Sequence, residues 1–500
     1  MLFSSYSFLF CFLPAALAGF ALLSRFRGPK AAKLWLVLAS LAFYGWWNPV
    51  YVGLILASMM FNFWLGRDLG RRRRSGRGTM AALAFGVGMN LALLGYFKYA
   101  NFFVNSVNGA SGLHWHLDKV VLPLGISFFT FTQIAYLVDV SRGIVCEYVL
   151  GDFLLFITFF PHLIAGPIIH HSEMMPQFAE ARTYRFDWHN LAVGLSLFSL
   201  GLFKKVVIAD AMAENAGKVF GAAAAGTLLV SRDAWAGVLA YTFQIYFDFC
   251  GYSDMAVALA RMFGIVLPQN FNSPYKAANL ADFWRRWHMT LSRFLRDYLY
   301  IPLGGNRRGE GRRHVNLIIT MGLGGLWHGA AWTFVVWGLF HGAGLAINHA
   351  WQAFWSKRGL ARPTGRPGGL SLWIGRALTL LFVMVGWAFF RSADLPAAGH
   401  LLAAMFGLAP GPVEGSPLLV KAKAWIWLAA LLAFVWCLPN TVEIMGGHSP
   451  LAQPAVADAA GPRGWRRWEM SPRWACLAAL LLAFSILGLS RAGEFLYYNF

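Results

Sequence analysis

The chain contains many apolar stretches long enough to cross a lipid bilayer, and this feature limits its fold more than any other. A membrane-spanning helix needs about 20 mainly apolar residues. The clearest candidates lie at Leu9–Leu23, Leu34–Trp47, Tyr51–Leu65, Met80–Tyr96 and Val121–Val138. Further stretches follow along the chain, so about 11–13 membrane segments are expected once re-entrant pieces are included. The sequence therefore predicts an all-α polytopic membrane protein, because no alternating strand pattern competes.

The composition agrees with a lipid environment and argues against nucleic acid as a partner. Charged residues make up 13% of the 500 residues, against roughly 25% in ordinary soluble domains. The formal net charge is +20, but the basic residues lie in short loops between apolar stretches and form no soluble basic domain. We therefore expect the lipid bilayer, and not nucleic acid, to surround this chain.

The basic loops also predict an orientation. The segment "SRFRGPKAAK" follows the first span and "RDLGRRRRSGR" follows the third. By the positive-inside rule both loops are cytoplasmic and the N-terminus is outside. The pair "KK" at 204–205 marks a further cytoplasmic helix end, and the first apolar segment is a retained span because it has no basic n-region.

The chain divides into three zones that differ in how often their apolar stretches are interrupted. Residues 1–120 are plain apolar helices with basic loops, whereas residues 351–500 alternate apolar helices with connectors and a C-terminal tail. Residues 121–350 contain apolar stretches broken by Pro, Gly, His and acidic residues. Irregular backbone at membrane depth persists only where it is buried or lines a cavity, so the middle zone is the expected catalytic core.

One segment of this core carries several polar side chains at helical spacing. The stretch "NLADFWRRWHMTLSRFLRDYLYIPLGG" predicts a helix that begins at Asn279 and stops at Pro302. The residues that fall on or beside one face of this helix are Trp284, Arg285, His288, Ser292 and Arg296. Spacing alone favours an amphipathic helix at the membrane surface over a catalytic one.

A histidine, His328, stands in the middle of the apolar stretch "MGLGGLWHGAAWTF". A charge at the bilayer centre costs roughly 2.5–3.5 kcal/mol, so this side chain is expected to be neutral and to face protein or water. A helix-bridging role and a catalytic role are about equally compatible with this segment. On one continuous helix Trp332 shares its face, whereas His341 points about 140° away and is the weaker candidate.

Other ionisable residues in the core predict structure more than chemistry. Asp248 and Asp254 do not share a helical face, so each is expected to pair internally, for example with an arginine of the 285–296 helix. His162, His170, His171 and Glu173 lack metal-site spacing, so no metal is predicted. The scattered cysteines suggest no zinc site or disulfide framework, and nucleotide-binding and serine-hydrolase motifs are missing from the sequence.

Several blocks of the sequence resemble one known family. The blocks are "FFPHLIAGPI", "YFDFCGYSDMAVALARMFGI", "NFNSPY", "DFWRRWHMTLSRFLRDYLYIPLGGNRRG", "GGLWHGAAWTFVVWGLFHG" and "FLYYNF". In this order they resemble the membrane-bound O-acyltransferase (MBOAT) superfamily, and most closely its alginate O-acetyltransferase branch of bacterial exopolysaccharide modifiers. The resemblance implies a helical bundle that encloses a tunnel, with His328 as the active-site histidine and His288 as the second family histidine.

The resemblance also implies a function. Acetyl would come from a cytoplasmic thioester, acetyl-CoA, with no bound cofactor, and would pass across the bacterial inner membrane to an exopolysaccharide such as alginate or cellulose. Periplasmic acetyltransferase proteins would be its partners. The expected substrate-binding residues are Trp327, Trp284, Arg285, Ser292 and Arg296. Arg285 and Arg286, with Arg307 and Arg308, would bind CoA phosphates, although surface anchoring explains them equally well.

The chemistry of histidine fits this function independently. Acyl transfer needs a base beside the acceptor hydroxyl and a donor for the developing oxyanion, and a neutral imidazole suits the first role. His288 would polarise the thioester carbonyl or hold the acceptor. Tyr497 is a possible acyl relay by resemblance, but an aromatic belt at the membrane interface explains the tail slightly better.

Two alternatives share parts of this pattern. Transfer of D-alanyl or acetyl groups to another cell-wall polymer would use every motif named above. A transporter or flippase also contains broken helices and intramembrane histidines, but it would favour two matching halves, and the sequence shows none.

Overall fold

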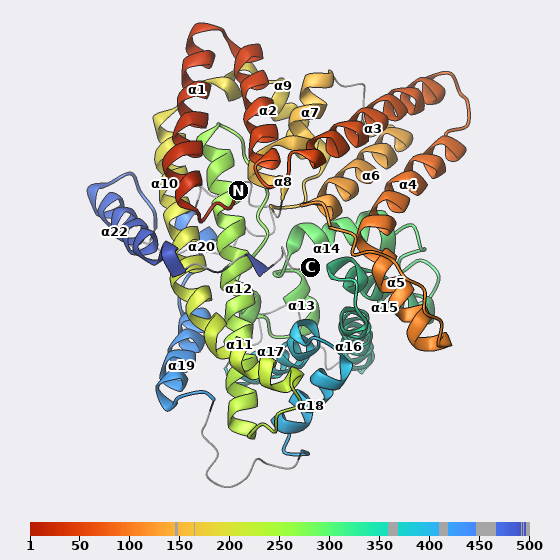
Figure 1. The fold of residues 1–500 in the computed structure, drawn as a ribbon, viewed down its shortest axis with the longest axis vertical. Helices are drawn as coiled ribbons and strands as arrows, with labels where there is room; N and C mark the ends of the chain where they lie inside the picture. The colour runs from red at the N-terminus through yellow and green to blue at the C-terminus, as the bar shows by residue number, and fades with distance from the viewer. Residues whose placement is uncertain are drawn as a thin grey trace.

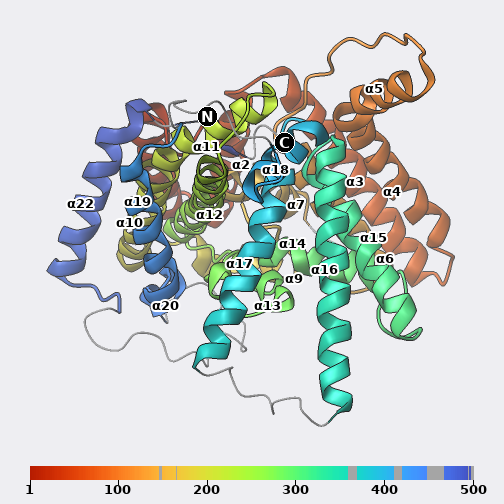
Figure 2. The same ribbon diagram turned by 90° about the horizontal axis from the view of Figure 1, so that it is seen from below.

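The computed structural model describes residues 1–145, 149–164, 166–358, 369–409, 419–446, 467–491, 493, 495 and 496. Within these ranges the regular secondary structure is entirely helical, which confirms the predicted all-α class. Figure 1 shows one long helix, α12 (Ser231–Met262), in the middle of the molecule. In the perpendicular view of Figure 2, α16, α17, α19 and α22 run between the upper and lower sides, as helices that cross a bilayer do.

The N-terminal region consists of two helical hairpins and a fifth helix. Its elements are η1 (Phe8–Phe12), α1 (Leu13–Phe26), α2 (Pro29–Gly45), α3 (Val50–Arg74), α4 (Met80–Leu94), η2 (Gly95–Tyr99) and α5 (Ala100–Ser111). Gly28 adopts a φ of +81° and Pro29 stands in the first turn of α2, so the first hairpin closes sharply. The element η2 is a π-helical turn, and it separates α4 from α5.

The segment from residue 121 to the central helix contains shorter and more irregular helices. These are α6 (Ile126–Arg142), α7 (Leu150–Thr158), α8 (Phe160–Leu163), α9 (His171–Ala179), η3 (Ala181–Tyr184), α10 (Trp188–Phe203), η4 (Lys204–Ala209) and α11 (Asp210–Ala224). The helix predicted at Val121–Val138 therefore begins only at Ile126, after an irregular stretch.

The central helix α12 is buried along nearly its whole length and carries two paired carboxylates. Lys205 Nζ lies 2.6 Å from Asp248 Oδ1, and Lys204 Nζ lies 2.6 Å from Asp254 Oδ2. The internal pairing of both acids is confirmed, but the expected arginine partners are wrong. The interpretation of residues 204–205 as a cytoplasmic helix end is also wrong, because Lys205 is only 1% exposed and serves as a counter-ion in the interior.

The helix predicted from Asn279 to Pro302 is broken into short pieces. Asn279 caps its start as expected, since its side chain accepts a hydrogen bond from Asp282 N at 2.9 Å. The pieces are α13 (Leu280–Trp284), α14 (Met289–Leu295) and the π-helical turn η6 (Arg296–Tyr300), and η5 (Pro274–Lys276) precedes them. The single polar face expected on one continuous helix is therefore wrong.

The next two helices form a tight hairpin. They are α15 (Glu310–His328) and α16 (Trp332–Lys357). A Cβ atom on Gly325 would lie 2.2 Å from Phe334 O, and one on Gly338 would lie 2.3 Å from Met321 O, so only glycine permits this approach. The chain turns between the helices, and Trp332 is 55% exposed. The prediction that Trp332 shares the face of His328 is therefore wrong.

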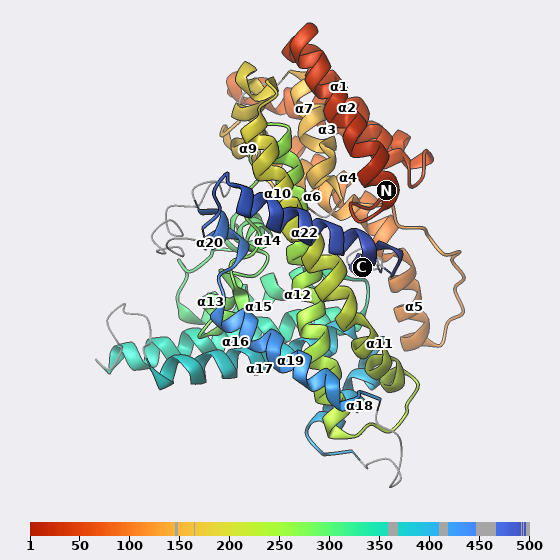
Figure 3. The same cartoon turned by 90° about the vertical axis from the view of Figure 1, so that its left-hand side faces the viewer.

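The C-terminal region surrounds the core. Its elements are α17 (Leu370–Arg391), α18 (Leu395–Met405), α19 (Ala422–Cys437), α20 (Thr441–Met445), α22 (Pro472–Gly488) and η9 (Leu489–Arg491). Figure 3 shows α19 and α22 lying across the face formed by α10 and α12. These C-terminal helices therefore shield part of the central helix.

Several helices have the length and composition of membrane spans. Among the residues that the structure describes, five stretches meet both requirements: Phe8–Phe26, Val50–Arg74, Met80–Ser111, Trp188–Ala224 and Leu370–Arg391. Shorter apolar helices are found at Leu395–Met405, Ala422–Cys437 and Pro472–Gly488. These stretches are fewer than the 11–13 membrane segments expected from the sequence. Interior helices such as α12 contain too many polar residues to meet the requirement for composition, and α2 is too short to meet the requirement for length.

We expect Lys205→Met to destabilise the protein strongly, because it leaves Asp248 charged and unpaired in the interior. Breaking one partner of a buried ion pair costs about 3–5 kcal/mol. The melting temperature of the purified protein in detergent should fall accordingly. The matched control is Lys218→Met, which removes an exposed ion pair with Glu214 and should leave the melting temperature unchanged. Equal effects of the two variants would contradict the structural role of Lys205.

Candidate active site

The two histidines singled out in the sequence lie against each other in the interior. His328 is the last residue of α15 and is 4% exposed, and His288 is 0% exposed. Their ring centroids are 6.3 Å apart, although 40 positions separate them in the sequence. The surface-helix interpretation of the segment that contains His288 is wrong, because Trp284 and His288 are both buried.

His288 stands in a strained backbone conformation. Its φ of 43° and ψ of 54° lie in the left-handed region, which residues other than glycine rarely adopt. Neighbouring hydrogen bonds hold this turn, since Met289 N donates to Asn270 O and Asn272 N donates to Arg286 O, both at 2.9 Å. The turn between α13 and α14 therefore fixes the direction in which the imidazole leaves the chain.

Asn270 also fixes the tautomer of His288. The Asn270 Oδ1 atom accepts from Thr290 N at 3.4 Å, and a backbone N–H can only donate, so this atom is the amide oxygen. His288 Nδ1 lies 3.0 Å from the same oxygen and must donate to it. The neutral ring therefore carries its proton on Nδ1 and its lone pair on Nε2. Sequence analysis missed Asn270, since only the segment "NFNSPY" pointed to this region.

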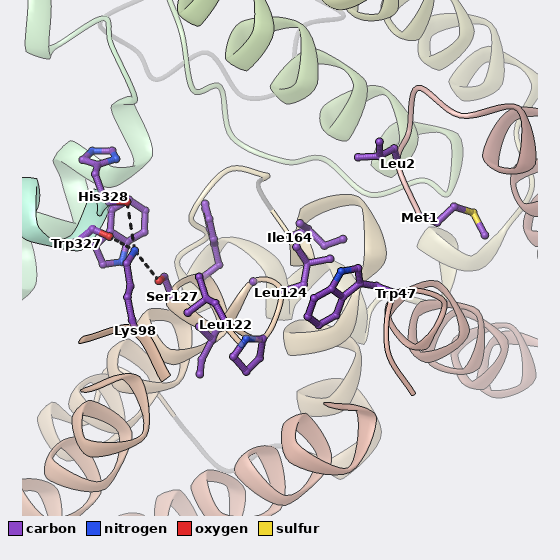
Figure 4. Close-up of a pocket in the computed structure, with 14 residues that line it drawn as sticks. Met1, Leu2, Trp47, Lys98, Leu122, Leu124, Ser127, Ile164, Trp327 and His328 are labelled. Carbon is purple, nitrogen blue, oxygen red and sulfur yellow. Dashed lines mark hydrogen bonds between the residues drawn. The ribbon is translucent and has the colours of Figure 1, made fainter. Parts of the chain in front are cut away.

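The end of α15, where His328 stands, is capped by two side chains from the π-helical turn η2. Tyr99 Oη donates to Leu326 O at 2.9 Å. Lys98 Nζ donates to Trp327 O and, at 3.4 Å, to His328 O and Ser127 Oγ. Figure 4 shows the bonds made by Lys98. Carbonyl groups at a helix C-terminus lack intrahelical partners, and a cation there is favourable. Lys98 and Tyr99 thus hold the turn that carries His328.

Aromatic rings enclose the imidazole of His328. Its ring centroid lies 5.2 Å from that of Trp337 and 5.4 Å from that of Phe390. Behind Trp337 is His341, whose Nδ1 accepts a hydrogen bond from Trp284 Nε1 at 3.3 Å. The angle that made His341 a weak candidate assumed one continuous helix. Trp337 and Phe390 form an aromatic wall beside His328. Because the chain turns between α15 and α16, His341 lies directly behind this wall.

A cavity of about 340 Å³ reaches this site. Its wall includes the N-terminal Met1, the irregular segment 122–125 with the first turn of α6, Lys98, Trp327 and His328, as Figure 4 shows for the labelled residues. This volume falls within the range of small-molecule sites, about 300–1,000 Å³. A substrate group in this cavity would therefore contact the turn that carries His328.

The other side chains predicted to bind substrate lie in different places. Trp327 lines the cavity, and Trp284 stands behind the aromatic wall. Ser292 Oγ donates to Trp284 O at 3.2 Å, which closes the α13–α14 turn. Arg285 and Arg296 are exposed, and Arg296 pairs with its neighbour Asp297 at 2.7 Å. The structure therefore does not bring these two arginines to the histidines.

The group of histidines between α8 and α9 has structural contacts. His162 Nε2 lies 2.9 Å from Phe156 O, and Glu173 receives a hydrogen bond from Arg293 Nη2 at 3.0 Å. Within the described ranges, no three His, Cys, Asp or Glu side chains gather in a metal-binding group.

The C-terminal tail enters the core close to His288. Leu496 N donates to Asp248 Oδ2 at 3.1 Å, and the Phe495 ring lies 4.1 Å from Tyr252. Phe249 contacts both Phe495 and His288, at 6.1 and 4.8 Å between ring centroids. The predicted relay Tyr497 lies outside the described residues.

Comparisons with known proteins agree with the resemblance noted in the sequence. The model of the membrane-bound O-acyltransferase family matches residues 110–386, a range that contains both histidines. The chain is 44% identical over 434 residues to the peptidoglycan O-acetyltransferase of Helicobacter pylori, covering 82% of this chain and 80% of that protein. It is 40% identical over 510 residues to the probable alginate O-acetylase AlgI of Pseudomonas putida, covering 100% of both. Teichoic acid D-alanyltransferase of Streptococcus thermophilus is 32% identical over 246 residues, 46% of this chain and 57% of that protein.

We expect Lys98→Met to loosen the last turn of α15, because the carbonyl groups of Trp327 and His328 lose their hydrogen-bond donor. Hydrogen exchange at the amides of this turn should become up to about tenfold faster, since a hydrogen bond contributes about 0.5–1.5 kcal/mol. Mass spectrometry of the exchanged protein would measure this. The control Lys119→Met changes an exposed lysine and should leave exchange in α15 unaltered. Unaltered exchange in Lys98→Met would rule out the capping role.

Proposed function

The chain belongs to the membrane-bound O-acyltransferase family, and from this premise we propose that it passes acetyl groups from a cytoplasmic thioester across the bacterial inner membrane to an exopolysaccharide such as alginate or cellulose. The observation that carries this proposal is the buried pair of His288 and His328 beside the 340 Å³ cavity. Acyl transfer requires a base and a site that excludes water, and this arrangement supplies both. Family membership favours an enzyme over the transporter considered above.

The two histidines take different roles in this proposal. His328 is the base that removes the proton from the acceptor hydroxyl as its oxygen attacks the thioester carbonyl. The thiolate leaves and takes up the proton that His328 accepted, which returns the imidazole to its neutral form. The Nδ1–H group of His288 donates a hydrogen bond to Asn270, so Nε2 carries a lone pair. Nε2 can therefore accept a hydrogen bond from the acceptor hydroxyl and hold it in place. The alternative, polarising the thioester carbonyl, would require a proton on Nε2.

The donor and the acceptor approach from opposite sides. Figure 2 shows α13 near the lower side and the N-terminus, which lines the cavity, near the upper side. Arg285 follows α13 and is exposed, which suits binding to the phosphates of acetyl-CoA. The enzyme needs no bound cofactor in this scheme. The acceptor or a periplasmic acetyltransferase partner would reach the cavity from outside.

A second acceptor is peptidoglycan. The observation that favours it is the 44% identity to the Helicobacter pylori peptidoglycan O-acetyltransferase. D-Alanyl transfer has weaker support, because the teichoic acid D-alanyltransferase matches 46% of this chain.

Tyr497 as an acyl relay is a further part of the proposal. It is supported by the neighbouring residues Phe495 and Leu496, which are 1% and 9% exposed and lie in the core. An aromatic belt at the membrane interface is the alternative role for this tyrosine.

We expect His328→Ala to abolish most acetyl transfer while the protein still folds. A well-placed base contributes roughly 10²–10⁴-fold to the rate. The measurement is transfer from labelled acetyl-CoA in membranes, with melting temperature checked in parallel. His116→Ala, in an exposed loop, is the control and should retain activity. Near-normal transfer by a folded His328→Ala protein would refute the mechanism.

Asn270→Leu should lower kcat by about tenfold, because His288 loses the acceptor that fixes its tautomer. The double variant Asn270→Leu, His288→Ala should be no slower than His288→Ala alone, since Asn270 acts through His288. The same labelled-acetyl assay measures all three variants. Additive losses would show that Asn270 contributes separately from the histidine.

Arg285→Gln should raise the KM for acetyl-CoA by about threefold to tenfold with little change in kcat, because it removes a phosphate contact made in ground and transition states alike. Arg296→Gln is the matched control, since Arg296 is already paired with Asp297. A KM unaffected by Arg285→Gln would point to surface anchoring as the role of this arginine.

A further inference from the structure

A second cavity, of about 150 Å³, lies where α3 ends beside α6. Three arginines of α3 contribute to its lining, namely Arg67, Arg73 and Arg74. No acidic side chain belongs to its lining among the described residues. The acyl-transfer scheme uses none of these groups, so the cavity needs its own explanation.

Glycines make room for the guanidinium groups. A Cβ atom on Gly143 would lie 2.1 Å from Arg73 Cζ, so the guanidinium rests directly on the backbone at the end of α6. Gly143 also has a φ of +75°, which disfavours other residues. Arg73 Nη1 donates to Ser141 O at 2.9 Å. One arginine of the cavity is therefore held in a fixed place by the end of α6.

The charges favour an anion. Arg72, which does not line the cavity, pairs with Asp68 at 2.6 Å. Arg67 and Arg73 form no ion pair with a described carboxylate; Arg67 instead lies 5.4 Å from the Trp64 ring centroid. Arginine binds phosphate oxygens through two parallel hydrogen bonds, and a phosphate group fits within this volume.

The position of the cavity relative to the membrane indicates which kind of molecule supplies the phosphate. The helix α3 is long and apolar enough to span the membrane, and it ends at Arg74 in the loop that the positive-inside rule places in the cytoplasm. Trp64 is 54% exposed about one turn before Arg67, as expected of an aromatic residue at the membrane interface. The cavity therefore lies at the depth of the lipid head groups.

From these observations we propose that the cavity between α3 and α6 binds the phosphate of an anionic phospholipid of the cytoplasmic leaflet. The bound head group would join the second helical hairpin to α6, which also contributes Ser127 and Phe128 to the 340 Å³ cavity. Basic pockets between membrane helices are suited to anionic head groups in this way. This site is independent of the acyl acceptor and of the donor.

The test is retention of phosphatidylglycerol by the purified full-length protein, measured by native mass spectrometry after delipidation and addition of defined lipid. We expect retention of phosphatidylglycerol but not of phosphatidylcholine. The double variant Arg67→Gln, Arg73→Gln should lower retention by roughly tenfold or more. Its matched control is Arg71→Gln, Arg77→Gln, which removes two exposed arginines that do not line the cavity and should change retention less than twofold.

A cavity-filling variant separates the site from general surface charge. A Cβ atom on Gly70 meets only Val140 Cγ1, at 3.9 Å, so Gly70→Leu places a side chain beside the cavity without altering charge. It should lower retention as far as the arginine double variant does. Equal retention of the two lipids, an equal loss in the control, or full retention by Gly70→Leu would overturn the proposal. Inorganic phosphate that displaces phosphatidylglycerol at a comparable concentration would also overturn it, because the site would then serve free phosphate.

Discussion

The interior of this protein has to satisfy every polar group without bulk water, and most of its architecture follows from that constraint. Unpaired charges and unbonded carbonyl groups in such an interior cost several kcal/mol each. The central helix therefore pairs Asp248 and Asp254 with two adjacent lysines. The same requirement explains why Lys98 and Tyr99 cap the end of α15. Polar residues in the core are thus placed by their partners more than by their position along a helix.

The candidate active site exists because two helices are interrupted. One break leaves His288 in the left-handed region, and the other ends α15 at His328. Backbone that leaves a helix needs new partners, and Asn270 and Lys98 supply them. The Asn270 side chain also fixes the ring of His288. The two interrupted segments thus place the histidine rings 6.3 Å apart.

The proposed function requires one site to serve two compartments. Trp337 and Phe390 cover part of the His328 ring, which in the proposed reaction would shield an acyl group from hydrolysis. The N-terminus and His328 both line the cavity, and Figure 2 shows α13 nearer the lower side than the N-terminus. The C-terminal tail adds Phe495 to the interior beside the same turn. In the proposed reaction, donor and acceptor would meet at the histidines from opposite sides.

The sequence by itself determined the all-α membrane class, because the length and apolarity of a span are local properties. It also made His328 a candidate, since an ionisable residue in an apolar stretch is costly, whereas His288 became a candidate through the motifs that carry the family resemblance. Only the tertiary structure decided which residues surround them. Asn270, Lys98 and the place of His341 depend on breaks in helices and on contacts between distant segments, which helical periodicity cannot predict, because it assumes that a helix continues.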